Sequence, residues 1–406
     1  MIALYTSSHQ VKSFYRSDFW FAGLAATFTG NGIGRFAYIT LMPVLIQAHW
    51  FSQEEAAQLG VAALLGYLLG PFLIQRFGSL VRRATLMRIA MLLCASSYFA
   101  CAFPQMGFGW FYTWRFLSGV GGAVLMILAA PMVLPHIRQD RRSRVAGVIF
   151  SGIGLGAALS GLLIPVLVQI HVKVAWVAMG LACAGLTLMT WKTWAELDSS
   201  PNSSAATPPV VKSHLMNWGI GYLLIAYALN AVGFLPHTLF WVDFLVRDLG
   251  FSLASGGLSW ALFGIGAAVG PLLTGVMGDR LGVRRCLVLG FGLKALGVMI
   301  PLVTQKLWML HCSAFLVGMF TPGIVTLVST YCLQLVGTQE HHRAWGAMTF
   351  SFALTQAIAG MGMAILLRQV SSYLPLYAIS AIALVISTVC ILCIPQPASI
   401  RAPESI

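Results

Sequence analysis

Three basic side chains lie inside long apolar runs of the sequence: Arg35, Arg115 and Lys294. A charge near the middle of a bilayer costs about 2.5 kcal/mol or more, so such residues usually face a cavity or a partner. The nearby acidic residues lie only toward the ends of the runs: Asp18, Glu54, Glu55, Asp243 and Asp248. Because a guanidinium matches carboxylate and phosphate geometry, the unmatched cations predict a binding site for a small anionic solute.

Each of the three cations also has a structural interpretation. Arg35, near the middle of the first run, could pair with backbone carbonyls, but we favour substrate binding or coupling. Arg115 follows Trp110 by about a turn and a half, so its long side chain could instead extend toward water. Lys294 could equally extend to the membrane interface or support helix packing.

Five polar side chains in the runs complete the candidate substrate-binding or coupling set: Asn31, Tyr38, Asn230, His237 and Gln356. Tyr38 lies one helical turn beyond Arg35. Buried amides are costly unless paired, so hydrogen bonding between helices explains the two asparagines as well as ligand contact does. His237 can carry a proton at physiological pH, although a paired core histidine is the simpler interpretation.

The composition of the chain defines the environment of these residues. Hydrophobic residues make up 58% of the 406, charged residues 9%, and the mean hydropathy is +0.84. A soluble domain is about 25% charged, so most of this surface must face the lipid bilayer. The net charge of +13 does not predict nucleic-acid binding, because the basic residues lie in short loops without a basic aromatic face. No nucleophile elbow, metal-ligand cluster or catalytic carboxylate pair occurs, so no enzyme, metal or cofactor is predicted.

Twelve apolar runs approach or exceed the roughly 20 residues that a helix needs to cross a bilayer. They are 19–47, 55–75, 84–104, 108–134, 145–170, 174–194, 215–245, 255–277, 286–305, 307–335, 345–367 and 373–394. Seventeen Lys and Arg residues fall on one side and four on the other. The positive-inside rule therefore predicts that both termini lie in the cytoplasm. We expect a multi-pass, monomeric protein of the bacterial cytoplasmic membrane.

The sequence also repeats itself at an offset of about 200 residues. Asn31 matches Asn230, and Gly70 matches Gly270, each pair on corresponding runs. Segment 195–214 is rich in Ser and Pro, which is the composition of a flexible linker. The prediction is an N-terminal six-helix bundle (1–194), a cytoplasmic linker (195–214) and a C-terminal six-helix bundle (215–406). Parallel repeats of this kind are one of the two arrangements known in secondary transporters.

Three motifs carry a resemblance to a known family. GVMGDRLGVRR (275–285) resembles the conserved cytoplasmic loop of the major facilitator superfamily, and RFLSGVGGA (115–123) resembles its fourth-span pattern. NGIGRFAYITLMP (31–43) is similar to the opening stretch of the YbfB/YjiJ-type branch. The resemblance implies an all-α fold of about twelve spans and transport by alternating access. It also implies that the first span lines the cavity and that the ninth span, which carries Lys294, is peripheral.

The resemblance further implies a gate formed by the loops after the second and eighth spans. The residues concerned are Gln75, Arg76, Arg144, Asp279, Arg280, Gly282, Arg284 and Arg285. Asp279 is expected to meet the N-terminus of the fifth span when the cytoplasmic side closes, because that helix end attracts a carboxylate by about 0.3–2 kcal/mol. Its first-half counterpart, Gln75, is neutral. Closure is therefore expected to depend on Asp279 more than on Gln75.

The leading hypothesis is a secondary active transporter for a small anionic solute. Anion exit is electrically downhill by about 2.3 kcal/mol per charge per 100 mV, and no carboxylate for proton coupling is evident, which favours efflux or exchange. A proton-coupled drug antiporter is an alternative, although the fifth span (152–161) lacks the Gly-Pro step of that group. A membrane-embedded transferase and a non-transporting receptor are alternatives of another class.

Overall fold

The computed structural model describes residues 17–77, 80–138, 141–199, 218–370 and 372–394, and all regular structure in these ranges is helical. The first half comprises α2 (Ser17–Thr27), α3 (Ala37–Gln47), α4 (Gln53–Phe77), α5 (Arg83–Ala100), α6 (Gly107–Val133), α7 (Arg142–Leu167) and α8 (Val172–Ser199). The second half comprises α9 (Trp218–Gly233), α10 (Trp241–Asp243), α11 (Leu253–Leu281), α12 (Val283–Val303), α13 (Leu307–Val370) and α14 (Leu374–Cys393). The predicted all-α fold is confirmed.

Ten segments of the described ranges are long and apolar enough to cross a membrane. They include two within α13, which Gly337 divides with a φ of 75°. The other two predicted spans are the first, which is broken between α2 and α3, and α5, whose first turns carry Arg83 and Arg88. Counting these two gives the twelve spans that the sequence predicts.

The first and seventh spans are interrupted at corresponding places. In the first, α2 continues into a π-helical turn, Phe28–Ile33, before α3 begins at Ala37. In the seventh, α9 ends at Gly233, and the π-helical turns Pro236–Phe240 and Phe244–Asp248 flank α10. Such turns interrupt the regular α-helical hydrogen bonding, and they often mark functional sites. The breaks therefore offer backbone carbonyls to side-chain donors at mid-span.

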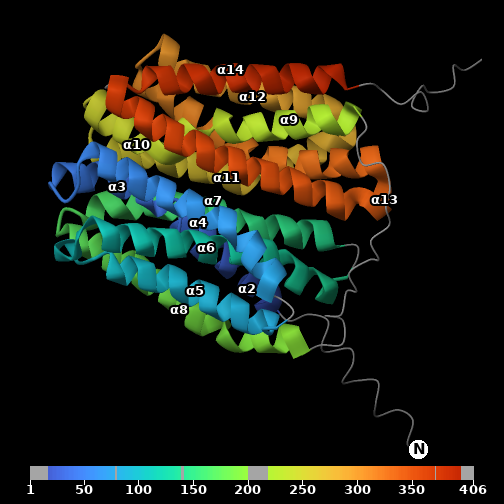
Figure 1. The fold of residues 1–406 in the computed structure, drawn as a ribbon, viewed down its shortest axis with the longest axis horizontal. Coiled ribbons are helices and arrows are strands. Elements are labelled where there is room, and N and C mark those ends of the chain that lie inside the picture. The colour runs from blue at the N-terminus through green and yellow to red at the C-terminus, as the bar shows by residue number, and fades with distance from the viewer. Residues whose placement is uncertain (1–16, 78–79, 139–140, 200–217, 371, 395–406) are drawn as a thin grey trace, which may run out of the picture.

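Helices α2 to α8 pack chiefly on one another, and helices α9 to α14 do the same. In Figure 1 the blue and green helices of the first group lie below the yellow to red helices of the second. The two groups meet along α7 with α11 and along α4 with α13. Near one end α3 also contacts α10.

Glycines set the closeness of packing within each group, and they do so in equivalent ways. A Cβ added to Gly66 would lie 1.9 Å from the carbonyl oxygen of Phe116, and one added to Gly266 would lie 2.4 Å from that of Phe315. Each residue of the second pair stands 199 or 200 residues after its counterpart in the first. The internal repeat seen in the sequence therefore extends to the packing of individual residues.

Glycines also line the contact between α7 and α11, which joins the two groups. A Cβ added to Gly154 would lie 2.3 Å from the carbonyl oxygen of Gly264, and one added to Gly161 would lie 2.5 Å from that of Gly257. These distances are far below van der Waals contact, so the helices touch backbone to backbone, as small residues permit in membranes. We call this contact the glycine seam.

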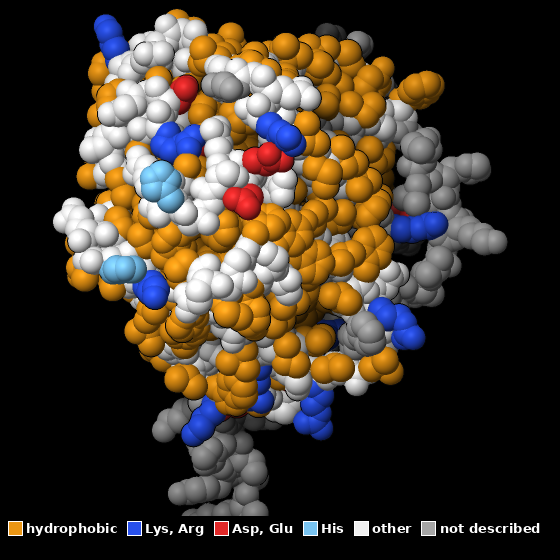
Figure 2. Space-filling model, turned by 60° about the vertical axis from the view of Figure 1, so that its left-hand side comes forward, with side chains coloured by type: hydrophobic (Ala, Val, Ile, Leu, Met, Phe, Trp, Pro, Cys, Tyr) orange, Lys and Arg blue, Asp and Glu red, His pale blue; other side chains and the backbone are white. Residues whose placement is uncertain are grey.

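The two ends of the bundle differ. At the terminal end, on the right of Figure 1, α2 begins, α14 ends and α13 bends at Gly337. The opposite end, here the loop end, carries the connections after α3 and α10. Helix α8 continues to Ser199, so the first five residues of the predicted linker are helical, and its remainder lies outside the described ranges. Figure 2 shows a flank covered by hydrophobic side chains, as a lipid-facing surface requires.

Candidate functional site

Arg35 lies at the break in the first span, between the π-helical turn and α3. It is half-buried, and its Nε and Nη2 atoms are buried without a hydrogen-bond acceptor among the described residues. Its guanidinium carbon lies 5.3 Å from the ring centre of Phe36 and 5.7 Å from that of Tyr67. Buried guanidinium donors are costly when unpaired. The geometry therefore presents a cation, flanked by two aromatic rings, that can bind an anionic oxygen.

Arg115 supports this break from α6. Its Nη1 donates to the carbonyl oxygen of Gly34 at 2.8 Å, and its Nη2 lies 3.5 Å from that of Arg35. The hydroxyl of Ser118 donates to the same Gly34 carbonyl at 3.1 Å. Arg115 is 1% exposed, so it does not extend toward water. The pairing with backbone carbonyls that we considered for Arg35 is made by Arg115 instead.

Tyr38 contributes to the same support. Its ring lies 4.5 Å from the guanidinium carbon of Arg115, within the range of a cation–π contact. Its hydroxyl donates to the carbonyl oxygen of Ala56 at 2.7 Å, which ties α3 to α4. Arg115 and Tyr38 are thus engaged with the protein itself through both Nη atoms and the phenol. Arg115 keeps one buried nitrogen without an acceptor, Nε, whereas Arg35 has two, Nε and Nη2.

An aromatic group in the second half includes Phe234, which stands 199 residues after Arg35 at the equivalent position of the repeat. Tyr227 stacks on Phe352 with ring centres 4.7 Å apart, and Phe234 stacks on the same ring at 5.9 Å. Trp345 extends the group, with its ring centre 5.7 Å from that of Tyr227. Tyr227 lies on α9 and Phe234 directly follows it, while Trp345 and Phe352 lie on α13. These rings can accommodate a planar solute by stacking.

Contacts between α4 and α13 place this aromatic group opposite the first-half site. The rings of Phe72 and Phe350 meet at 5.6 Å, and a Cβ added to Gly360 would lie 2.8 Å from Leu64. Tyr67 lies between Leu64 and Phe72 on α4, while Phe352 and Gln356 lie between Phe350 and Gly360 on α13. The two stretches therefore face each other where the halves meet. Gln356 is 1% exposed, and its Nε2 has no acceptor in the described ranges.

Lys294 is fully buried in the second half. Its Nζ donates to the Oδ1 of Asn230 at 3.0 Å and lies 4.5 Å from the ring centre of Phe234. It therefore reaches inward from α12 to α9 and does not extend to the interface. The counterpart Asn31 is also buried, but its Oδ1 has no donor among the residues described. The two asparagines share a place in the repeat and differ in their partners.

His237 is fully buried between aromatic rings. Its ring stacks on Trp241 at 4.2 Å, and its Nε2 lies 2.9 Å from the hydroxyl of Ser313. That hydroxyl donates to the carbonyl oxygen of Gly297 at 2.6 Å, so its single hydrogen is used and Nε2 must be the donor. His237 is thus paired in the core, and it does not lie with Arg35.

Some residues of the predicted gating loop have structural contacts, and the others are exposed. Gly282 ends α11 with a φ of 83°, a conformation that favours glycine. Arg284 donates from Nη2 to the carbonyl oxygen of Leu392 at 2.7 Å, which ties α12 to the end of α14. Asp279 is exposed and forms no hydrogen bond or ion pair with any described residue. The other predicted gating residues are also exposed at the terminal end: Gln75, Arg76, Arg144, Arg280 and Arg285.

Sequence reasoning missed one buried carboxylate. Asp243 is 0% exposed, pairs with Arg247 at 2.8 Å and accepts a hydrogen bond from the Tyr373 hydroxyl. The sequence placed it near the end of a run, whereas the π-helical turn after α10 continues the seventh span to Asp248. Asp243 pairs with Arg247, so within the described residues Arg35, Arg115 and Lys294 still have no carboxylate partner. What the sequence did not show is that a carboxylate is fully buried in the seventh span. The spacing of Asp243 and Arg247, four residues apart, was the available signal.

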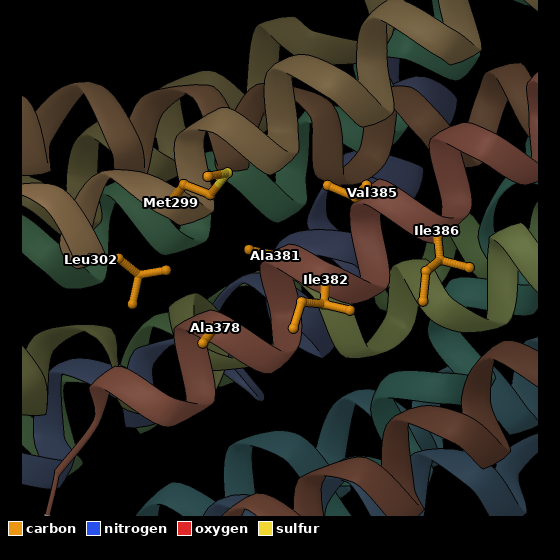
Figure 3. Close-up of a pocket in the computed structure, with 7 residues that line it drawn as sticks. All are labelled: Met299, Leu302, Ala378, Ala381, Ile382, Val385 and Ile386. Atoms are coloured by element: carbon orange, nitrogen blue, oxygen red, sulfur yellow. The ribbon is translucent and has the colours of Figure 1, made fainter.

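A cavity elsewhere in the molecule has a different character. It is a groove of about 280 Å³ between α12 and α14, lined only by apolar side chains (Figure 3). These are Met299, Leu302, Ala378, Ala381, Ile382, Val385 and Ile386. No group there can bind a polar solute, and its outer side chains are exposed on the hydrophobic flank.

Two repeated sets of membrane-crossing helices, each broken within its first member, form the fold of a major facilitator transporter. A family model described as "Uncharacterised MFS-type transporter YbfB" matches residues 27–392. The chain belongs to this transporter family, and it is a multi-pass membrane protein.

Characterised relatives and a solved structure agree with this assignment. A gentisate transporter of Corynebacterium glutamicum is 21% identical, over 73% of this chain and 69% of its own length. A gallate transporter of Pseudomonas putida is 21% identical, over 74% and 73%. The cyanate transport protein CynX of Escherichia coli is 26% identical, over 69% and 73%. The crystal structure of a D-xylose-proton symporter shares the fold, with a TM-score of 0.70, 14% identity and coverage of 93% and 97%.

Proposed function

We propose that this transporter moves a small organic anion across the bacterial cytoplasmic membrane by alternating access. The observation that carries the proposal is the guanidinium of Arg35, half-buried at mid-span with two buried nitrogens unpaired. The bundles 1–194 and 215–406 rock about their shared contacts, joined by the linker 195–214 on the cytoplasmic side. The protein acts as a monomer, because one chain supplies both sides of the site.

The aromatic group opposite Arg35 supports a planar, aromatic carboxylate as the substrate. Stacking on Tyr227 and Phe352 would hold the ring, while Arg35 would bind the carboxylate by two parallel hydrogen bonds. Two of the relatives carry names of hydroxybenzoates, gentisate and gallate, and a third is named for the small anion cyanate. Efflux or exchange was favoured by the lack of a buried carboxylate. Because Asp243 is a buried carboxylate, this argument no longer favours efflux or exchange over uptake.

Ligand binding tests this proposal on the purified protein. Hydroxybenzoates at a hundred times their Kd should stabilise the folded state by about 2.7 kcal/mol, which raises the melting temperature measurably. The matched controls are the corresponding benzamides, which keep the ring and lose the charge. They should stabilise much less, because Arg35 then lacks its charged partner. Equal stabilisation by acid and amide would contradict an anion site.

We further propose that Asp279 closes the terminal end in the alternative conformation, by binding the start of α7. Asp279→Asn should then shift the population toward the form open at the terminal end, and Gln75→Ala should shift it little, since an amide binds a helix N-terminus more weakly. The distance between spin labels on cysteines introduced at Leu80 and Leu281, which are exposed at the terminal end on opposite halves, reports opening. Equal responses from the two variants would show that the difference between the loops has no part in gating.

A further inference from the structure

The two halves are joined at the loop end by polar contacts between α4 and the second half. Gln53 donates from Nε2 to the Tyr373 hydroxyl at 3.2 Å, and Glu54 pairs with Arg368 at 3.1 Å. Tyr373 donates in turn to Asp243. We call these five residues the loop-end latch. Because its members come from both bundles, the latch must break whenever this end opens.

The buried hydrogen bonds of the latch contribute more to holding the halves together than its exposed ion pair does. The side chains of Glu54 and Arg368 are 39% and 67% exposed, and solvent screens ion pairs of this kind. Asp243 and Tyr373 are 0% and 3% exposed, so their hydrogen bond acts in a low dielectric. The Gln53–Tyr373–Asp243 chain is therefore the stronger connection between the halves.

The direction of the hydrogen bonds depends on the charge of Asp243. An ionised carboxylate only accepts, so the Tyr373 hydroxyl must donate to it, and the phenol oxygen is then available to accept from Gln53. This ordered chain polarises each member in the same sense. A protonated Asp243 offers its own hydrogen, which competes with Gln53 for the phenol oxygen. Protonation thus weakens the bond that joins the halves.

Among the ionisable groups in the buried part of the latch, Asp243 is the one that we expect to change its charge with pH. Its charged neighbours are Arg247, which pairs with it, and Asp248 at the exposed end of the span. The other titratable groups around it are neutral donors or rings: Tyr38, His237, Tyr373 and Tyr377. Burial and the adjacent carboxylate raise the pKa of Tyr373, so its hydroxyl stays protonated.

We propose that Asp243 is a proton-binding site that controls the loop-end gate: ionised, it holds the latch closed, and a proton taken from the outside opens it. The proton enters on a carboxylate oxygen of Asp243, and Arg247 remains charged. This proposal rests on the proposed function. Protonation of Asp243 would couple the uptake of one anion to that of one proton, so that the two ions cross the membrane together without net charge. It requires the loop end to face outward, as the distribution of basic residues predicts.

Spin labels across the latch test the gate without any substrate. Cysteines at Ala48, after α3, and Val370, at the end of α13, lie on opposite halves and are exposed. The exposed native Cys312 and Cys393 are first replaced by serine. Lowering the pH from about 8 to about 5 should increase the population with the longer distance between labels. An unchanged distribution over this range would overturn the proposal.

Variants separate the charge of Asp243 from general damage. Asp243→Asn should give the acid-type distribution at every pH, while Asp248→Asn, the same change at an exposed carboxylate of the same span, should titrate like the wild type. Gln53→Ala removes the bond between halves but leaves the partners of Asp243, so it should open the gate without loss of melting temperature. A Gln53→Ala protein that stays closed and pH-sensitive would also refute the latch.

Transport in proteoliposomes supplies the second arm. Asp243→Asn should lose accumulation driven by a pH gradient, by at least tenfold, and should retain exchange of labelled for unlabelled anion. Retained pH-driven accumulation in this variant would overturn the coupling. If the spin labels respond to pH and no anion is transported, the gate stands and the proposed substrate class fails, so the two proposals are judged separately.

Discussion

Replacing Arg35 with glutamine is expected to abolish anion transport while the protein remains folded. Glutamine keeps a hydrogen-bond donor but loses the charge, and a buried charge pair that loses one partner costs about 2–5 kcal/mol, or roughly 30-fold to several-thousand-fold in affinity. Arg35→Lys should also be poor, because an ammonium cannot form two parallel bonds to a carboxylate. Uptake and binding in proteoliposomes measure the loss, and the melting temperature reports the fold.

The control for this experiment is the same substitution at an exposed position. Arg82 precedes α5 at the terminal end and is exposed, so Arg82→Gln should transport like the wild type. The Arg35 variant should not lose stability, since its unpaired nitrogens are a cost in the folded state. Normal transport by Arg35→Gln would remove the basis of the anion site.

Replacing Arg115 with methionine is expected to have the opposite profile, with a large loss of stability. The substitution keeps an unbranched apolar stem and removes the donors to the Gly34 and Arg35 carbonyls. The Gly34 carbonyl then keeps only the Ser118 hydroxyl, and the Arg35 carbonyl loses its side-chain donor. Hydrogen bonds to a charged group contribute about 1.5–3 kcal/mol each, so we expect the break in the first span to lose much of its support. The melting temperature and the yield of monodisperse protein in detergent measure the effect.

Ser118→Ala is the graded comparison, because it removes only the second donor to the Gly34 carbonyl. It should lower the melting temperature less than Arg115→Met does. If Arg115→Met melts like the wild type and loses only binding, Arg115 contacts the substrate, and its assignment as a support of the break is wrong.

The sequence predicts the membrane architecture because bilayer physics acts on quantities that are readable along the chain. Span length, the placement of basic residues and the repeat of glycines each follow from one-dimensional patterns. The same reasoning selected Arg35 as a candidate, since a single charge within an apolar run is visible without knowing its neighbours. It also found Asn230 and Lys294, but not that they would pair across 64 residues of sequence.

The sequence could not show which groups each polar side chain contacts in the fold. Arg115 and Arg35 have the same chemistry and similar surroundings in the sequence, and only the fold shows that Arg115 binds backbone carbonyls through both Nη atoms. The burial of Asp243 was not foreseen because it depends on packing against Tyr373, which lies 130 residues away in the sequence. Local periodicity does not reveal such contacts, since they depend on packing against other helices.

The glycine seam has a consequence for the speed of the transport cycle. Interlocking side chains would have to leave their sockets and change rotamers as one bundle tilts on the other, which raises an activation barrier. No side chains interlock where Gly154 meets Gly264 and where Gly161 meets Gly257. The two helices can therefore move along each other at these contacts without rotamer changes. For the proposed cycle we therefore expect a low barrier between the two end conformations. A single hydrogen bond far from the seam, such as that of the proposed latch, would then be enough to decide which conformation dominates.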